Sequence, residues 1–70
     1  MKYAVVIERT TTGFSAYVPD LPGCIATAAS MVELEQSMRE AIELHLDGLR
    51  EDGQPVPEPT ASVEYFDVAA

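Results

Sequence analysis

The sequence has few of the residues on which common kinds of stabilisation and chemistry depend. Its 70 residues include one cysteine, Cys24, so no intrachain disulfide can form, and its single histidine leaves no spaced Cys/His set for zinc. No apolar run approaches the roughly 20 residues that cross a bilayer. A chain this short makes one domain, residues 1–70. It buries only about 60% of its unfolded surface, so we expect a homo-oligomer, a dimer or a tetramer.

Basic residues are also scarce. Four Lys and Arg stand against twelve Asp and Glu, which gives a net charge of −8. Phosphate backbones are bound by clustered Lys and Arg, so we expect no direct binding of DNA or RNA. An acidic surface suits a basic protein partner, although it also keeps a small protein in solution. The chain shows no charged-then-apolar leader and its lone cysteine fits a reducing compartment, which together favour the cytoplasm.

The hydrophobic pattern predicts four strands and one helix. Alternating apolar and polar residues predict strands at about 2–9, 14–18, 24–28 and 62–68. Ser30 and Glu33 form a capping box that begins a helix over about 31–52, and Gly53 ends it. Three alternating prolines make 54–59 an extended linker. The β-β-β-α-β order predicts an α+β fold, a two-layer sandwich in which a small, mainly antiparallel sheet packs on one long helix.

Two of these elements have informative faces. One stripe of the helix is apolar at 100° per residue and comprises Leu34, Met38, Ala41, Ile42, His45 and Leu49. The last strand has apolar side chains on both faces, because Val63 and Tyr65 alternate with Phe66 and Val68. We therefore expect this strand to be covered on both sides, in part by another subunit.

No group of residues predicts a catalytic site. Cys24 would need a lowered pKa to act as a nucleophile, and a small apolar filler beside a glycine turn explains it better. His45 could be a general base or a pH switch, but no second histidine, serine or cysteine accompanies it, which favours an interior or interface histidine. A site for two divalent metals would need Glu8, a helix glutamate and Glu64 or Asp67 to converge, whereas the helix acids lie on the outer face. We expect no enzyme, no metal site and no cofactor.

A constrained turn carries the clearest motif. Pro19-Asp20-Leu21-Pro22-Gly23-Cys24 places two prolines and a glycine between two strands, which fixes the backbone tightly. Together with the two-strand opening, the capped helix carrying Glu40-Ala41-Ile42 and the Gly-x-x-x-Pro spacing at 53–57, this motif resembles the HicB-like antitoxin family over nearly the whole chain. The resemblance implies a partial ribonuclease H-like domain. It also implies a partner, HicA, a small basic toxin that cleaves messenger RNA.

The chain departs from the family pattern in two places. Ala28-Ala29-Ser30 stands where members often carry a glycine and an acidic residue before the helix. Many members also have a C-terminal DNA-binding domain, and we expect this chain to be a short form without one. Autoregulation by direct DNA binding is therefore not expected.

The resemblance and the charge together predict an antitoxin-like protein that binds and neutralises a HicA-like toxin by covering its RNA site. We expect the partner contacts at Tyr17, Pro19, Asp20, Leu21 and Pro22, with Asp20 pairing to a basic group. The alternative is a stand-alone homo-oligomeric scaffold or small-ligand module without a toxin. A small basic reading frame beside the gene would separate the two hypotheses.

Overall fold

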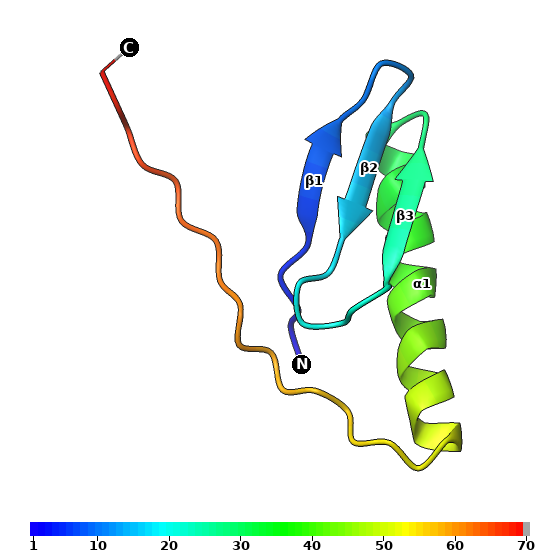
Figure 1. Ribbon diagram of the computed structural model, residues 1–70. Coiled ribbons are helices and arrows are strands. Elements are labelled where there is room, and N and C mark those ends of the chain that lie inside the picture. The colour runs from blue at the N-terminus through cyan, green and yellow to red at the C-terminus, as the bar shows by residue number, and fades with distance from the viewer. Residues whose placement is uncertain (70) are drawn as a thin grey trace.

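A three-stranded antiparallel sheet with one long helix packed against it makes up the ordered body of the chain (Figure 1). The computed structural model describes residues 1–69. The elements follow in the order β1 (Val6–Arg9), β2 (Phe14–Tyr17), β3 (Ile25–Ala28) and α1 (Met31–Glu51). β2 is the central strand and pairs antiparallel with both neighbours. The two-layer α+β class expected from the sequence is therefore confirmed.

The core lies between the sheet and α1. Six apolar side chains are buried there, namely Ala16, Val18, Leu21, Cys24, Leu34 and Met38. Ala41, Ile42 and Leu46 extend the helical stripe and pack against this cluster. α1 contacts β3 most extensively and β2 less, so the helix lies over one half of the sheet. No helix in the described part of the chain has the apolar length that a membrane span requires.

Both ends of α1 have the capping chemistry that the sequence indicates. The hydroxyl of Ser30 accepts a hydrogen bond from the backbone N–H of Glu33 at 3.2 Å, which satisfies one of the free donors of the first turn. At the other end Gly53 adopts φ 68°, a left-handed conformation that glycine adopts without steric cost. The helix is thus bounded by local interactions at both termini.

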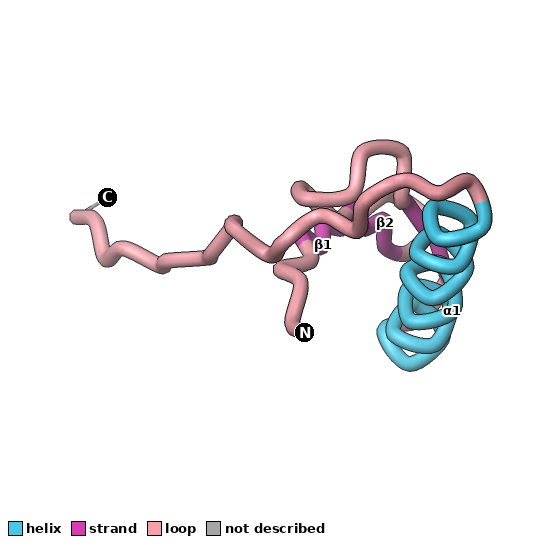
Figure 2. Tube along the Cα trace, turned by 90° about the horizontal axis from the view of Figure 1, so that it is seen from below, coloured by secondary structure: helices cyan, strands magenta, loops and turns pink. Residues whose placement is uncertain are grey.

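The chain after α1 differs from expectation. The strand predicted at 62–68 is not formed, because no residue after position 53 joins a helix or a sheet within the described chain. Figure 1 and Figure 2 show this segment running past the sheet and then away from the body on the side of β1. The two-sided apolar pattern is that of a strand, but a strand also needs a neighbour to accept its backbone hydrogen bonds. We call residues 62–68 the tail.

The tail gives the molecule an extended shape. The radius of gyration is 13.8 Å and the longest dimension is 48 Å. A compact chain of 70 residues is expected to have a radius of gyration of about 11 Å. One copy of the chain is therefore less compact than a globular domain of the same length.

Candidate protein-binding surface

The turn over residues 18–24 is a rigid, hydrogen-bonded element. The Val18 N–H donates to the Cys24 carbonyl at 3.1 Å, and the Cys24 N–H donates to the Leu21 carbonyl at 3.0 Å. Gly23 adopts φ 85°, which other residues rarely do. Leu21 is 0% exposed and inserts into the core, so the turn is held from within. Its outer residues are consequently presented in a fixed position.

Asp20 ties this turn to the C-terminal part of the chain. Its carboxylate accepts hydrogen bonds from the Thr60 hydroxyl at 2.8 Å, from the Thr60 N–H at 3.0 Å and from the Ala61 N–H at 3.0 Å. These bonds, that from Ala61 above all, lower the pKa of Asp20 below its ordinary value, because they favour the charged form. The hydroxyl of Tyr3 also donates to the Pro57 carbonyl. Residues 57–61 are therefore fastened to the body at two points.

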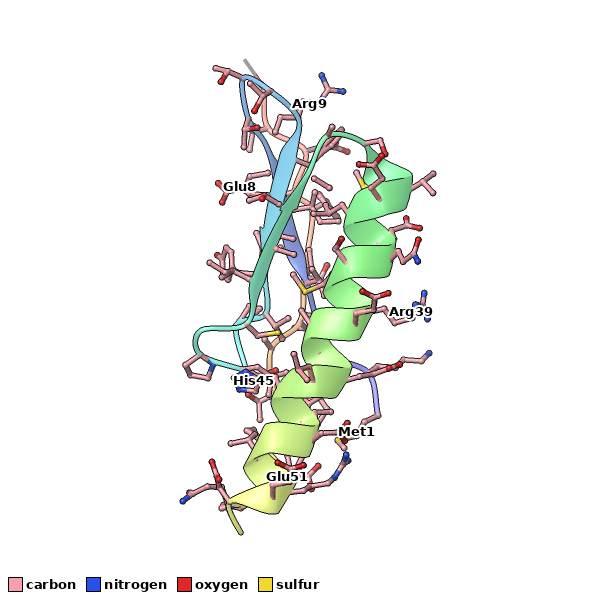
Figure 3. The ribbon with its side chains drawn as sticks, turned by 90° about the vertical axis from the view of Figure 1, so that its right-hand side faces the viewer. Met1, Glu8, Arg9, Arg39, His45 and Glu51 are labelled. Atoms are coloured by element: carbon pink, nitrogen blue, oxygen red, sulfur yellow. The ribbon has the colours of Figure 1, made fainter. Side chains whose placement is uncertain are left out.

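The face of the sheet that points away from α1 carries an exposed apolar row. Val6 is the cross-strand partner of Tyr17, and Tyr17 is in turn the partner of Ile25. Tyr17 is 43% exposed and Ile25 is 67% exposed. Glu8 lies on the same face, and Figure 3 shows its side chain on the side of the sheet opposite to α1. We call Val6, Tyr17 and Ile25 the outer row.

The structure separates the five residues that the sequence analysis expected at a partner interface. Tyr17, Pro19 and Pro22 are exposed, whereas Leu21 is fully buried and acts as an internal support of the turn. The Asp20 carboxylate is occupied by Thr60 and Ala61. Sequence reasoning missed Ile25, because the alanine-rich third strand gave a weak pattern. The alternation of Ile25 and Thr27 with the two alanines of β3 is the pattern that could have placed Ile25 on the outer face.

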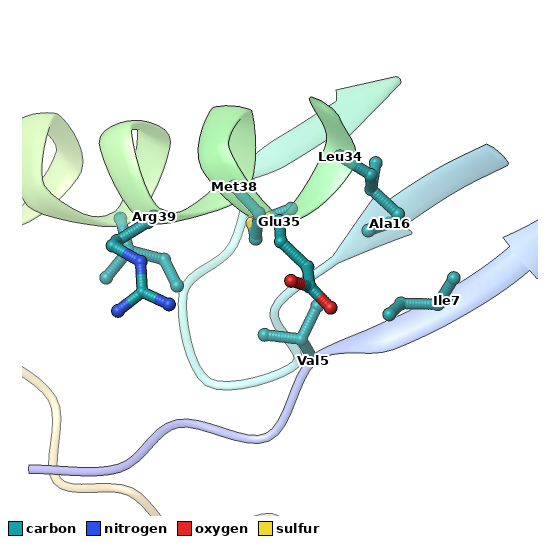
Figure 4. A pocket seen from close by; sticks show the side chains of 8 residues that line it. Val5, Ile7, Ala16, Leu34, Glu35, Met38 and Arg39 are labelled. Carbon is teal, nitrogen blue, oxygen red and sulfur yellow. The ribbon is translucent and has the colours of Figure 1, made fainter. Parts of the chain in front are cut away.

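A second apolar surface lies between β1 and α1. A groove of about 240 Å³ opens beside β1 where α1 does not cover the sheet, and its lining comprises Val5, Ile7, Ala16, Leu34, Glu35, Met38, Arg39 and Ile42. Figure 4 shows Glu35 reaching from α1 toward Val5, with Arg39 beside it. The one ion pair within 4 Å in residues 1–69 joins Arg50 to Asp47, so Arg39 has no carboxylate within that distance. The groove is thus apolar inside and carries one carboxylate, that of Glu35, and one cation, that of Arg39.

The chain matches a known family over almost its entire length. Residues 3–69 match the family model described as the HicB-like antitoxin of bacterial toxin-antitoxin systems. The chain belongs to the HicB-like antitoxin family. The resemblance noted from the turn motif and its spacing is therefore confirmed.

Similar proteins extend this assignment. A solved structure described as the HicA3 and HicB3 toxin-antitoxin complex contains a chain with 30% identity and a TM-score of 0.74, over 86% of this HicB-like chain and 70% of that one. A UPF0150 protein of Archaeoglobus fulgidus is 46% identical over 57 residues, which are 77% of this chain and 83% of that protein. An uncharacterised 14.9 kDa protein of Haemophilus phage HP1 is 32% identical over 94% of this chain. The HicB-like chain spans 50% of that phage protein.

The residues that the sequence analysis considered for catalysis or metal binding do not form a cluster in the described part of this HicB-like chain. Cys24 is buried in the core, and burial raises the pKa of its thiol, which disfavours the thiolate that a nucleophile needs. His45 is half-buried, and Figure 3 shows it on the side of α1 that faces the sheet. Within residues 1–69 no three His, Cys, Asp or Glu side chains are close enough to hold a metal ion. HicB-like antitoxins are not a class of enzymes.

Proposed function

We propose that this chain binds and neutralises a small, basic HicA-like toxin by covering the surface with which the toxin holds RNA. The observation that carries the proposal is the family match over residues 3–69, supported by the likeness to a chain of the HicA3 and HicB3 complex. The net charge of −8 supports a basic partner, since opposite fields speed encounter and disfavour wrong partners. The chain inhibits by occupying a surface and performs no chemistry itself. Its place of action is the cytoplasm, where messenger RNA is translated.

The contact surface in this proposal is the outer row together with the exposed prolines of the turn. Tyr17 and Ile25 supply an apolar centre of the kind that dominates interface energetics, and Pro19 and Pro22 add a rigid rim. Leu21 and Asp20 contribute by holding the turn in shape. The Asp20 carboxylate accepts hydrogen bonds from Thr60 and Ala61, so it is a supporting residue in this proposal rather than an ionic contact.

Direct contact with nucleic acid has no part in this proposal. Lys2, Arg9, Arg39 and Arg50 are the only basic residues. Figure 3 shows Arg9 at one end of the sheet and Arg39 near the middle of α1, so these two do not contribute to one patch. A phosphate backbone requires several cations along one surface.

Co-expression tests the proposal. The chain is produced together with the small basic reading frame beside its gene, and we expect the two proteins to co-purify and growth to be restored. Tyr17→Asp is expected to weaken binding at least about tenfold, because it places a charge at the centre of the interface. Leu44→Asp is the matched control, since Leu44 is 75% exposed on α1 and lies outside the outer row.

Each result decides a separate part of the proposal. Absence of co-purification and of growth rescue would refute the antitoxin function. Equal loss of binding in the Tyr17 and Leu44 variants, with both folded by circular dichroism, would refute the contact surface. The alternative is a stand-alone homo-oligomeric scaffold or small-ligand module. The apolar groove beside β1 supports it, and absence of a basic neighbouring gene would favour it.

A further inference from the structure

The groove between β1 and α1 has an apolar floor and an apolar wall. Core side chains, those of Ala16, Leu34 and Met38, are buried beneath it and form the floor. Val5 and Ile7 form the wall on the side of β1. Within residues 1–69 the helix packs against β3 and β2 and not against β1, which leaves this space open. The groove therefore results from the way in which α1 lies on the sheet.

The volume of the groove limits the size of a ligand. At about 240 Å³ it is smaller than the roughly 300–1,000 Å³ of sites for drug-sized molecules. An apolar protein cavity of about 150 Å³ is large enough to bind benzene. The groove thus has room for one branched or aromatic side chain with a short polar head, and too little room for a long lipid chain.

Two charged residues of α1, Glu35 and Arg39, complete the lining of the groove. Figure 4 shows the Glu35 carboxylate reaching from α1 toward Val5 and the Arg39 guanidinium pointing to the same side of the helix. An acid and a base four residues apart in this order commonly attract one another on a helix. The one ion pair within 4 Å in residues 1–69 is that of Arg50 with Asp47, so Glu35 and Arg39 do not pair. The groove therefore offers a carboxylate and a guanidinium separately to a ligand.

These two charges select among the small apolar ligands that fit. An apolar amine would leave Arg39 without a counter-charge. An apolar carboxylate would face Glu35, and the net charge of −8 would oppose its approach. A zwitterion satisfies both side chains, because its ammonium group donates to Glu35 while its carboxylate accepts from Arg39. The chemistry of the groove therefore favours a ligand that carries both charges next to an apolar group.

We propose that the groove binds a free α-amino acid with a branched or aromatic apolar side chain, such as leucine or phenylalanine. The ligand side chain packs on Met38 between Ile42 and the wall on the side of β1. Its ammonium and carboxylate groups lie between Glu35 and Arg39. The groove is on the α1 side of the sheet and the outer row is on the opposite face, so the two surfaces are separate. The proposal goes beyond the antitoxin function and does not depend on it.

Methyl NMR spectra of the full chain, titrated with leucine, test the proposal first. We expect saturable shifts of the methyl signals of Val5, Ile7 and Ile42, with a Kd of about 1 mM or below. The methyl signals of Ile25 in the outer row are the internal control and should stay in place. Isopentylamine lacks the carboxylate and isocaproate lacks the amine, so each should bind about tenfold more weakly than leucine. Glycine has both charges but no side chain and should cause no shift.

Two neutral variants test the partners assigned to the head of the ligand. Arg39→Gln should weaken the binding of leucine about tenfold but leave that of isopentylamine unchanged, because this amine has no carboxylate for Arg39 to hold. Glu35→Gln should weaken leucine binding by a similar factor without weakening that of isocaproate. Arg50→Gln is the matched control, since Arg50 pairs with Asp47 and does not line the groove. All of these side chains are exposed, so the fold should survive each change.

The contrary outcomes are equally distinct. Groove signals that respond to no amino acid, or that move only when a protein binds, would overturn the proposal. Shifts that glycine causes as strongly as leucine would refute the apolar part of the site. Equal loss of leucine binding in the Arg39 and Arg50 variants, with both folded by circular dichroism, would refute the assigned charge contacts. None of these measurements involves a toxin, so their failure would leave the antitoxin proposal standing.

Discussion

The two halves of the sheet differ in what covers them. The half formed by β2 and β3 lies under α1, and the buried core, which includes Leu21 and Leu34, lies at this side of the sheet. The β1 half has an open groove on one face, the outer row on the other and an edge without a ladder partner in residues 1–69. The covered half has the features of a folded monomer. The open half leaves apolar surface exposed on both faces of the sheet.

Leu21→Ala should have the largest effect, because it removes support from the covered half. Leu21 is fully buried, and such truncations cost about 2–5 kcal/mol. A domain of this length has roughly 4–10 kcal/mol of stability in total. Urea unfolding followed by circular dichroism measures the loss. Leu44→Ala is the control, since Leu44 is exposed, and an equal loss in both variants would contradict the assignment of Leu21 to the core.

A pair of glycines provides a smaller and more specific test of the covered half. A methyl group on Gly13 would collide with the backbone carbonyl oxygen of Ala28 and the Cα of Ala29, so Gly13→Ala should cost about 1–3 kcal/mol. Gly48 lies within α1 with open space around it, and Gly48→Ala should stabilise by about 0.5–1 kcal/mol. Thermal unfolding of the two variants should therefore shift in opposite directions. Shifts of the same sign would be inconsistent with the packing of the 10–13 turn against β3.

The smallest effect concerns the connection between the turn of the covered half and the C-terminal segment. The pKa of Asp20 is lowered on folding, so its stabilising contribution is complete above its ordinary value of 3.8 and disappears as the pH falls through the lower value in the folded chain. The amide signals of Thr60 and Ala61 should move together during this titration in NMR spectra. Asp20→Asn should abolish that movement, because a side-chain amide does not ionise in this pH range. A titration midpoint above 3.8 would argue against the three hydrogen bonds.

The fold of the covered half could be predicted because local and global signals agree there. Ser30 caps the helix, Gly53 ends it, and Leu34 and Met38 recur on one face. The turn motif also identified the family. The surface was predicted less well, since a Pro- and Gly-rich turn does not reveal which of its side chains points inward. Leu21 is an apolar residue between exposed neighbours, and only the packed structure shows that it closes the core.

The tail could not be predicted because its conformation depends on more than its own sequence. The alternation of Val63 and Tyr65 with Phe66 and Val68 is a strand pattern, and a pattern specifies a conformation only where a hydrogen-bonding neighbour exists. The surroundings of Asp20 could not be predicted either. Its position in a turn suggested a contact with a partner, whereas its acceptors are used by residues forty positions later in the same chain.

The Asp20 carboxylate connects two segments that are distant in sequence through hydrogen bonds. Its acceptor atoms hold the loop between β2 and β3 and the start of the C-terminal segment in one fixed relation. A ligand that remodels that loop must therefore also displace the C-terminal segment. By thermodynamic linkage, whatever captures the C-terminal segment changes the affinity for that ligand by the same factor.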